Sequence, residues 1–230
     1  MKIICFGDSL TRGVSIVKGR LRILKENYPA FLQEWFQQKH EDDIKVVNKG
    51  IFNADSDLLL TRLDKDVIEE KPDYAIIEIG GNDCNFHWKE VAERPYDEHT
   101  AIVPIERYLK NIKDMVVKVK NAGITPMIMN LPPLDPVRYY KQISETYGTA
   151  ISHFICSVGG IEFWHENYHR MLNKLIDQLK VIKIDSRNVI SPEQDLTDII
   201  SDDGIHLTAL GYKTLSLEAF KGLSALINRK

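Results

Sequence analysis

The sequence is poor in cysteine, in long apolar runs and in excess charge of either sign. Its three cysteines, Cys5, Cys84 and Cys156, stand far apart and form no CxxC pair, which argues against a disulfide framework or a four-cysteine zinc site. No apolar run approaches the roughly 20 residues of a membrane span, so we expect no integral membrane segment. The formal net charge is −3 with both signs interspersed, so we expect no nucleic acid as a partner.

The chain also lacks internal repeats, low-complexity tracts and Gly/Ser-rich linkers. Its 230 residues are 43% hydrophobic and 27% charged, which is typical of a globular protein. We therefore expect a single domain over residues 1–230. The N-terminus does not resemble a signal peptide, because Met1 and Lys2 lead directly into the apolar run at 3–6, and we expect a cytoplasmic protein.

Short apolar runs alternate along the chain with longer amphipathic segments. The runs, which have the length of buried strands, occupy residues 2–6, 44–48, 74–79, 124–129 and 181–185. The helical patterns occupy residues 28–40, 55–70, 104–121, 161–180 and 208–228. This alternation predicts an α/β fold in which helices cover both faces of a parallel sheet. Such sheets bind ligands at the carboxyl ends of their strands, which is where chemistry is expected.

Two connections, at 84–103 and 130–160, are longer than a compact fold usually needs. Connections of this length are usually binding loops or lids. Both carry aromatic side chains, which suit a pocket wall or can stack on a sugar, although packing alone would also explain them. We expect Trp88 and Tyr139, one from each connection, to contact the substrate.

Residues suited to catalysis follow the predicted strands or precede the last helix. Ser9 follows the first apolar run beside a glycine, so its hydroxyl is a candidate nucleophile, with a helix-capping serine as the alternative. Asn82 follows two glycines after the third run and can aim its amide at a ligand, or it can simply form a turn. Asp203 and His206 share one loop, so the carboxylate can orient the imidazole as a base.

Four sequence blocks occur in order along the chain: FGDSLTRG from Phe6, NKGIFNADS at 48–56, GGND at 80–83 and DGIHLT at 203–208. Together they resemble the four blocks of the SGNH/GDSL hydrolase family, and their spacing over residues 5–212 covers nearly the whole chain. The resemblance implies a three-layer α/β/α, flavodoxin-like fold with a five-stranded parallel sheet. It also implies a carboxylic ester hydrolase that needs no cofactor.

The resemblance also assigns roles to residues of these blocks. Ser9 would be the nucleophile, and His206 and Asp203 would complete a Ser-His-Asp triad. The Ser9 backbone N–H and the Asn82 side chain would hold the oxyanion. Asp8, which belongs to the first block, is a candidate substrate-binding residue.

The second block departs from the family pattern. A glycine usually supplies the third oxyanion donor there, but Asn53 stands at that position in this chain. Gly50 fills the earlier small position of the block and is the alternative donor. Because an oxyanion donor can be a backbone N–H, Asn53 can serve without a change in chemistry.

The resemblance leaves the substrate open among small-molecule, glycan and lipid esters, including O-acetylated carbohydrates and lysophospholipids. An acyltransferase or a thioesterase could use the same site, and the oligomeric state is open as well. A flavodoxin-like binding module that holds FMN or phosphate at residues 7–13 is the alternative from a different class. That alternative leaves Asp203 and His206 without a role.

Residues 165–169 match the HExxH motif of zinc proteases. His165 and His169 would share one face of a helix. However, no further histidine follows at the spacing of the extended motif, and an apolar stripe runs along the same segment. We interpret the segment as a packing helix with exposed histidines, and we expect no metal site.

Overall fold

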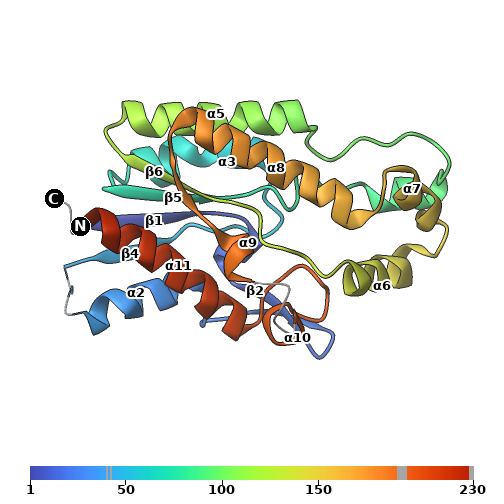
Figure 1. The fold of residues 1–230 in the computed structure, drawn as a ribbon, viewed down its shortest axis with the longest axis horizontal. Helices are drawn as coiled ribbons and strands as arrows, with labels where there is room; N and C mark the ends of the chain where they lie inside the picture. Colours follow the sequence, from blue (N-terminus) through green and yellow to red (C-terminus); the bar gives the residue numbers. More distant parts are fainter. Residues whose placement is uncertain (40, 42, 191–195, 228–230) are drawn as a thin grey trace.

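The computed structural model describes residues 1–39, 41, 43–190 and 196–227, which are organised around a central parallel sheet (Figure 1). The strands of this sheet are β1 (Lys2–Gly7), β4 (Lys45–Asn48), β5 (Tyr74–Glu78), β6 (Thr125–Met129) and β7 (Ile182–Ile184). They follow the order β4-β1-β5-β6-β7, and each neighbouring pair is parallel. This order, with helices on both faces, confirms the predicted three-layer, flavodoxin-like fold.

Strand β1 shows why the sheet is covered on both faces. It lies between β4 and β5 and reads as an uninterrupted apolar run. Ile4 and Phe6 are buried in the core on one face, whereas Ile3 and Cys5 are buried in the core on the other. Because successive strand residues point to opposite faces, a run of this kind requires helices on both sides.

The helices divide between these two cores. α3 (Ser56–Leu63), α5 (Ile105–Asn121) and α8 (Ile161–Leu179) supply buried side chains to one core. α2 (Tyr28–Gln38) and α11 (Ala209–Ile227) supply buried side chains to the other core. Figure 1 shows the two groups on opposite sides of the sheet.

Most of the predicted helices begin and end within a residue or two of their predicted bounds. The predicted segment 55–70 differs, because α3 ends at Leu63 and a π-helical turn, η1 (Asp64–Ile68), continues it. Residues 40 and 228, at the ends of two predicted helices, lie outside the described part of the chain.

The two long connections contain helices that the sequence pattern did not predict. α4 (Trp88–Glu93) lies in the first, and α6 (Pro136–Tyr147) and α7 (Ile151–Ser157) lie in the second. A local signal was present for α6, because Asp135 caps it and proline is its first residue. These helices extend beyond the carboxyl edge of the sheet (Figure 1). The two connections therefore contain regular helices and are not irregular loops throughout.

A β-hairpin follows the first strand and was not predicted either. The short helix α1 (Ser9–Arg12) leads into β2 (Val14–Val17), which pairs antiparallel with β3 (Arg20–Ile23). Lys18 and Gly19 form the turn with φ of 52° and 69°. Two successive residues at positive φ are typical of the tight turn that joins antiparallel strands.

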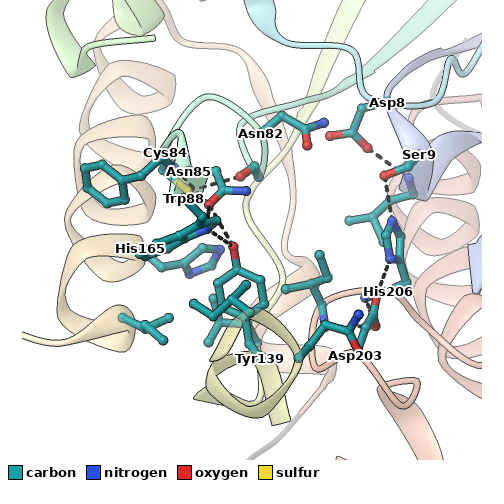
Figure 2. Close-up of a pocket in the computed structure, with 18 of the residues that line it drawn as sticks. Asp8, Ser9, Asn82, Cys84, Asn85, Trp88, Tyr139, His165, Asp203 and His206 are labelled. Atoms are coloured by element: carbon teal, nitrogen blue, oxygen red, sulfur yellow. Dashed lines mark hydrogen bonds and ion pairs between the residues drawn. The ribbon is translucent and has the colours of Figure 1, made fainter. Parts of the chain in front are cut away.

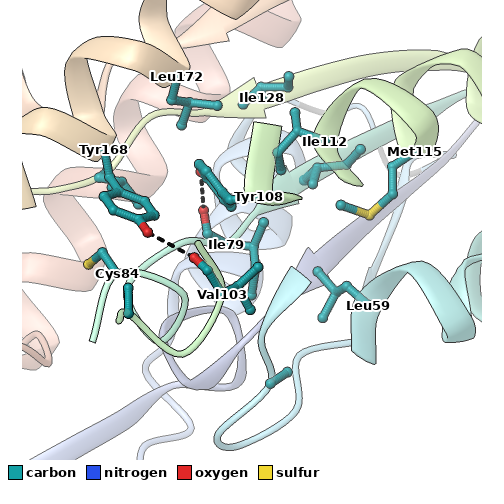
Figure 3. Close-up of a cluster of buried hydrophobic side chains, with 14 of the residues drawn as sticks. Leu59, Ile79, Cys84, Val103, Tyr108, Ile112, Met115, Ile128, Tyr168 and Leu172 are labelled. Atoms are coloured by element: carbon teal, nitrogen blue, oxygen red, sulfur yellow. Dashed lines mark hydrogen bonds between the residues drawn. The ribbon is translucent and has the colours of Figure 1, made fainter. Parts of the chain in front are cut away.

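Two buried tyrosines tie α5 and α8 to the chain that leaves β5 (Figure 3). Tyr108 donates to the Ile79 carbonyl at 3.0 Å, and Tyr168 donates to the Val103 carbonyl at 2.8 Å. Gly80 follows with φ of 137°, and a Cβ there would lie 2.7 Å from the Tyr108 hydroxyl oxygen. The packing therefore requires glycine at this position and fixes the turn that follows it.

Candidate active site

Ser9 stands at the carboxyl end of β1, as the first residue of α1. Asp8 caps this helix, because its Oδ1 accepts a hydrogen bond from the Leu10 N–H at 2.8 Å. The Ser9 side chain is 7% exposed and lines a cavity at the edge of the sheet. The serine is therefore held where a parallel sheet binds its ligands.

Three residues from the two ends of the chain form a continuous line of hydrogen bonds (Figure 2). His206 Nε2 lies 2.9 Å from Ser9 Oγ, and His206 Nδ1 lies 2.5 Å from Asp203 Oδ2. The structure thus brings together the residues that the sequence analysis selected as nucleophile, base and carboxylate. In this geometry the imidazole can take a proton from the hydroxyl while the carboxylate holds its other nitrogen.

Asp203 is ionised by its surroundings. Burial by itself raises the pKa of this carboxyl, but hydrogen bonds from His206 and Ser201 lower the pKa below its ordinary value. Ser201 donates to Asp203 Oδ1 at 2.8 Å. The sequence analysis missed Ser201, because a serine outside the recognised blocks carries no signal of its own. Its effect is to keep a negative charge beside the imidazole.

The turn that carries His206 is built locally. Asp203 Oδ1 accepts the backbone N–H groups of Ile205 and His206 at 3.2 and 3.1 Å, which is a turn that a short carboxylate side chain stabilises. Gly204 adopts φ of 80°, and a Cβ there would lie 2.4 Å from the Tyr139 backbone nitrogen. The turn therefore packs tightly against α6.

One hydrogen bond orients the Asn82 amide and leaves the second N–H group of its nitrogen available. Its Nδ2 donates to the Ala54 carbonyl at 2.7 Å. Because a carboxamide nitrogen carries two N–H groups, the second one remains for an oxyanion. Asn82 lines the same cavity as Ser9. The side chain can therefore stabilise negative charge that develops beside the serine.

The two candidates for the third oxyanion donor differ in position. Asn53 lines the cavity and adopts φ of 58°, in the left-handed region where asparagine is tolerated. The Gly50 N–H already donates to Asn48 Oδ1 at 2.9 Å. A Cβ on Gly50 would lie 2.3 Å from the Arg12 backbone nitrogen, so this glycine serves close packing instead. The geometry favours Asn53 over Gly50.

Asp83 supports the turn that carries Asn82. Its carboxylate oxygens accept the Ser56 N–H at 3.0 and 3.2 Å, which joins the turn after β5 to the start of α3. Burial raises the pKa of Asp83 to about 7. The sequence analysis assigned no role to Asp83 and missed this link.

Asp8 is a structural cap in this structure as well as a cavity-lining residue. Burial raises the pKa of Asp8 well above its ordinary value, and the neighbouring Glu78 raises it further. Burial also raises the pKa of Glu78, whose Oε2 accepts a hydrogen bond from the Thr11 hydroxyl at 2.9 Å. Two buried carboxyl groups this close favour a state in which one of them is protonated.

The cavity has a volume of about 480 Å³ and two ends of different character (Figure 2). The serine end comprises Ser9, Asn53, Asn82, Asp203 and His206. The aromatic end comprises Asn85, Phe86, Trp88, Tyr139, Trp164 and His165. Trp88 and Tyr139 therefore lie in the cavity wall, where the sequence analysis expected substrate contacts, and both are buried there.

The interpretation of residues 165–169 was wrong in one respect. His165 is not exposed but 7% accessible, because α8 packs its face against the cavity. His169 is half-buried, with Nδ1 3.1 Å from the Leu131 carbonyl oxygen, and Glu166 forms an ion pair with Arg187. His169 and Glu166 thus have separate partners, and neither partner is His165. Within the described ranges, no group of three or more His, Cys, Asp or Glu side chains is arranged to hold a metal ion.

The fold and the cavity together define a class of protein. A doubly wound sheet with a hydrogen-bonded serine, histidine and aspartate at its carboxyl edge is the arrangement of a three-layer α/β/α hydrolase. The chain belongs to the GDSL-like Lipase/Acylhydrolase family, whose sequence model matches residues 5–214. This match confirms the family resemblance of the four blocks, and the protein is a carboxylic ester hydrolase.

Individual relatives and solved structures are similar to this chain at low sequence identity. An acetylxylan esterase of Geobacillus stearothermophilus is 28% identical over 159 residues, which cover 65% of this chain and 69% of that protein. An uncharacterized lipoprotein of Bacillus subtilis is 23% identical over 193 residues, 80% of this chain and 70% of that protein. The solved structure of a lipase/acylhydrolase from Enterococcus faecalis superposes with a TM-score of 0.71 at 17% identity, covering 97% of this chain and 95% of that one.

The location of the protein in the cell stays a prediction, because one relative is a lipoprotein. Among the residues that the structure describes, no helix combines the length and the apolar character that a bilayer span requires.

Proposed function

We propose that the protein hydrolyses carboxylic esters through an acyl-enzyme on Ser9, with His206 as general base and Asp203 as its orienting carboxylate. The observation that carries this proposal is the line of hydrogen bonds from Ser9 Oγ through both nitrogens of His206 to Asp203. A serine hydroxyl is a weak nucleophile at neutral pH, and an adjacent base that removes its proton is what activates it.

In the first step, Ser9 Oγ attacks the ester carbonyl while its proton moves to His206 Nε2. The resulting imidazolium is stabilised by Asp203, whose lowered pKa keeps it ionised. The carbonyl oxygen becomes an oxyanion, which accepts hydrogen bonds from the second Asn82 N–H and from the backbone N–H groups of Ser9 and Asn53. His206 then protonates the leaving alcohol.

In the second step, water attacks the acyl-enzyme. His206 removes a proton from this water and returns it to Ser9 Oγ when the tetrahedral intermediate collapses. The same donors stabilise the second oxyanion. The products are the free acid, the alcohol and the regenerated serine.

The cavity favours an ester with an extended apolar part. Its volume of about 480 Å³ exceeds what an acetyl group fills, and its wall beyond the serine end is mostly aliphatic and aromatic. Esters of medium-chain acids fit this description. A carbohydrate O-acetyl ester is the second candidate, which the relationship to an acetylxylan esterase favours.

A panel of substrates distinguishes these candidates. The purified protein is assayed with p-nitrophenyl esters of rising acyl-chain length beside acetylated xylooligosaccharides, and kcat/KM is compared across the panel. A maximum at medium chain length supports the apolar substrate, whereas activity confined to acetylated sugars supports the second candidate.

The nucleophile is tested separately with a fluorophosphonate. This reagent should label the peptide that contains Ser9, and His206→Ala should slow the labelling because the hydroxyl is no longer activated. Labelling of a different serine in the folded protein would exclude the proposed mechanism.

A further inference from the structure

The aromatic end of the cavity contains two polar side chains that the proposed chemistry does not use. Asn85 and His165 lie across the cavity from Ser9 and His206 (Figure 2). Their neighbours in the wall are mainly aromatic or aliphatic, such as Phe86, Trp164 and Ile161. Placing polar groups in an apolar wall is costly unless they have partners.

The orientation of the Asn85 amide is fixed by its neighbours. Its Oδ1 accepts hydrogen bonds from the Phe86 backbone N–H at 2.9 Å, the Trp88 indole N–H at 2.8 Å and the Tyr139 hydroxyl at 2.7 Å. The first two partners can only donate, so the oxygen must be the atom that faces them. The amide nitrogen, with two N–H groups, is left as the part of Asn85 available to a ligand.

His165 has no comparable role within the protein. Its side chain is more than nine-tenths buried, and its Nδ1 is fully buried without a hydrogen-bond partner in the part of the chain that the structure describes. Burial lowers the pKa of His165 to about 3, and the charges of Arg187 and His169 add to the effect. The imidazole is therefore neutral and can offer one donor and one acceptor.

Packing alone does not account for a histidine at position 165. A phenylalanine would fill the same space in the cavity wall without an unpaired nitrogen, and therefore at a lower cost of burial. Because Nδ1 has no accessible surface, a ligand in the cavity that His165 lines would meet the ring through its other nitrogen, Nε2.

We propose that Asn85 and His165 form a polar subsite for an oxygen atom carried by the apolar part of the ester. This inference rests on the proposed esterase function and narrows its substrate. The Asn85 N–H groups can donate to a hydroxyl or carbonyl oxygen, and the neutral imidazole can donate to it or accept from a hydroxyl. The preferred substrate is thus an ester whose chain is apolar near the reacting carbonyl and oxygenated further along.

Two kinds of ester meet this description, since the oxygen can stand on the acyl chain or on the alcohol part. The first arm of the test compares p-nitrophenyl octanoate with a set of p-nitrophenyl hydroxyoctanoates in which the hydroxyl moves along the chain. The second arm compares octyl acetate with hydroxyoctyl acetates, measured by acid release. In each arm the quantity is the ratio of kcat/KM for the oxygenated ester to that for the unsubstituted one.

Two variants probe the subsite without removing its support. His165→Phe keeps an aromatic ring of similar size and removes both ring nitrogens. Asn85→Asp keeps the acceptor for Phe86, Trp88 and Tyr139 but replaces the N–H donors. His153→Phe is the matched control, because His153 is exposed and lies outside the cavity wall.

We expect the oxygenated ester to be favoured about tenfold in one arm, as one well-placed hydrogen bond allows, mainly through KM. His165→Phe and Asn85→Asp should each reduce this ratio about tenfold, whereas His153→Phe should leave it unchanged. Ratios near one in both arms for the parent protein, or ratios that neither variant alters, would overturn the subsite.

A binding measurement separates this inference from the proposed mechanism. Octanol and octanediol are titrated while the fluorescence of the cavity tryptophans is recorded. The diol should bind more tightly to the parent protein and to Ser9→Ala, but not to His165→Phe. Equal binding of the two alcohols to the parent protein would exclude the subsite. Turnover retained by Ser9→Ala would exclude the mechanism while leaving this comparison valid.

Discussion

The two ends of the cavity are built in different ways. At the serine end, side chains at strand ends and in a turn are held by short-range hydrogen bonds, such as those that the Leu10 N–H donates to Asp8 and the His206 N–H donates to Asp203. At the aromatic end, rings from separate helices pack edge to face, as Trp88 of α4 does against Tyr139 of α6 at 6.4 Å between centroids. Caps and turns fix the individual catalytic side chains, and packing between distant segments fixes the space beside them. The difference suggests that specificity can change while the reaction stays the same.

Hydrogen bonds between the start of α6 and the turn that carries His206 connect the two ends of the cavity. The Asp135 N–H donates to the Gly204 carbonyl at 2.8 Å, and Arg138 donates to the Ile200 carbonyl at 2.8 Å. These bonds attach α6, which carries Tyr139, to the turn that carries His206. A change that moves the whole of α6 should therefore disturb catalysis, whereas a change of one cavity side chain should not.

The largest effects are expected at the serine end. Ser9→Ala and His206→Ala should each lower kcat on a short aryl ester by about 10³-fold or more, because nucleophile and base act as one unit. Circular dichroism and the melting temperature serve as controls for folding. Near-normal turnover by a folded Ser9→Ala protein would contradict the assignment of the nucleophile.

A smaller loss is expected when one oxyanion donor is removed. Asn82→Ala should lower kcat by about 10²–10³-fold, because the variant lacks the side-chain N–H that stabilises the oxyanion in the transition state. The measurement is steady-state kcat on one aryl ester, with Asn82→Asp as a variant that keeps the shape. If Asn82→Ala turned over at the parent rate, the oxyanion would have to lie elsewhere.

Asp83, which follows Asn82 of the serine end, should make the stability of the fold depend on pH. Because burial raises the pKa of Asp83 to about 7, the folded protein keeps a proton that the unfolded chain releases. The resulting stabilisation is fully present below about pH 4 and is lost as the pH rises through about 7. Asp83→Asn should therefore gain stability relative to the parent at high pH, by at most about 4 kcal/mol.

The measurement for Asp83 is the melting temperature of both proteins between about pH 5 and about pH 8. The parent should lose stability more steeply than Asp83→Asn over this range. Asp64→Asn is the control, because the Asp64 side chain is 64% exposed. Parallel curves for the parent and Asp83→Asn would show that Asp83 is ionised throughout.

Changes at the aromatic end should alter substrate ranking rather than the reaction. Trp88→Ala enlarges the cavity and should shift the preference among acyl chain lengths by about tenfold toward longer chains. Acetyl ester turnover should stay close to the parent rate. Tyr96→Ala is the control, since Tyr96 is 81% exposed. An equal loss on every substrate would show that Trp88 only supports the fold.

Much of the serine end could be predicted from the sequence because each of its parts follows a recognisable local pattern, although Ser9 and His206 lie 197 positions apart. Asp203 and His206 are three residues apart, and Ser9 comes two residues after a strand whose apolar run is easily recognised. The five strands and the principal helices were predictable for the same reason, since each has a hydrophobic period of its own.

The aromatic connections could be recognised as a pocket wall, but the contacts within the aromatic end could not be predicted because they cross long stretches of chain. Tyr139 and Trp88 are hydrogen-bonded across 51 positions, and no local pattern signals such a pair. His165 was misjudged for the same reason. The helix that carries His165 was correctly predicted. Which face of this helix lies against the cavity depends on α6 and α7, and these two helices were not predicted.

The smallest effect is expected at Asn53, where the chain departs from the family pattern. Its φ of 58° is the conformation for which glycine is normally used, and asparagine is among the few other residues that adopt it readily. If only the backbone N–H serves the oxyanion, the Asn53 side chain is dispensable, and Asn53→Gly should keep kcat within about tenfold of the parent. Asn53→Ala should cost about 1–2 kcal/mol of stability through left-handed strain, while a folded fraction should turn over normally. The pair is compared by kcat on one ester and by melting temperature. A loss of kcat well beyond tenfold in Asn53→Gly would show that the Asn53 side-chain amide itself contacts the substrate. The serine end would then contain a side-chain donor in addition to Asn82.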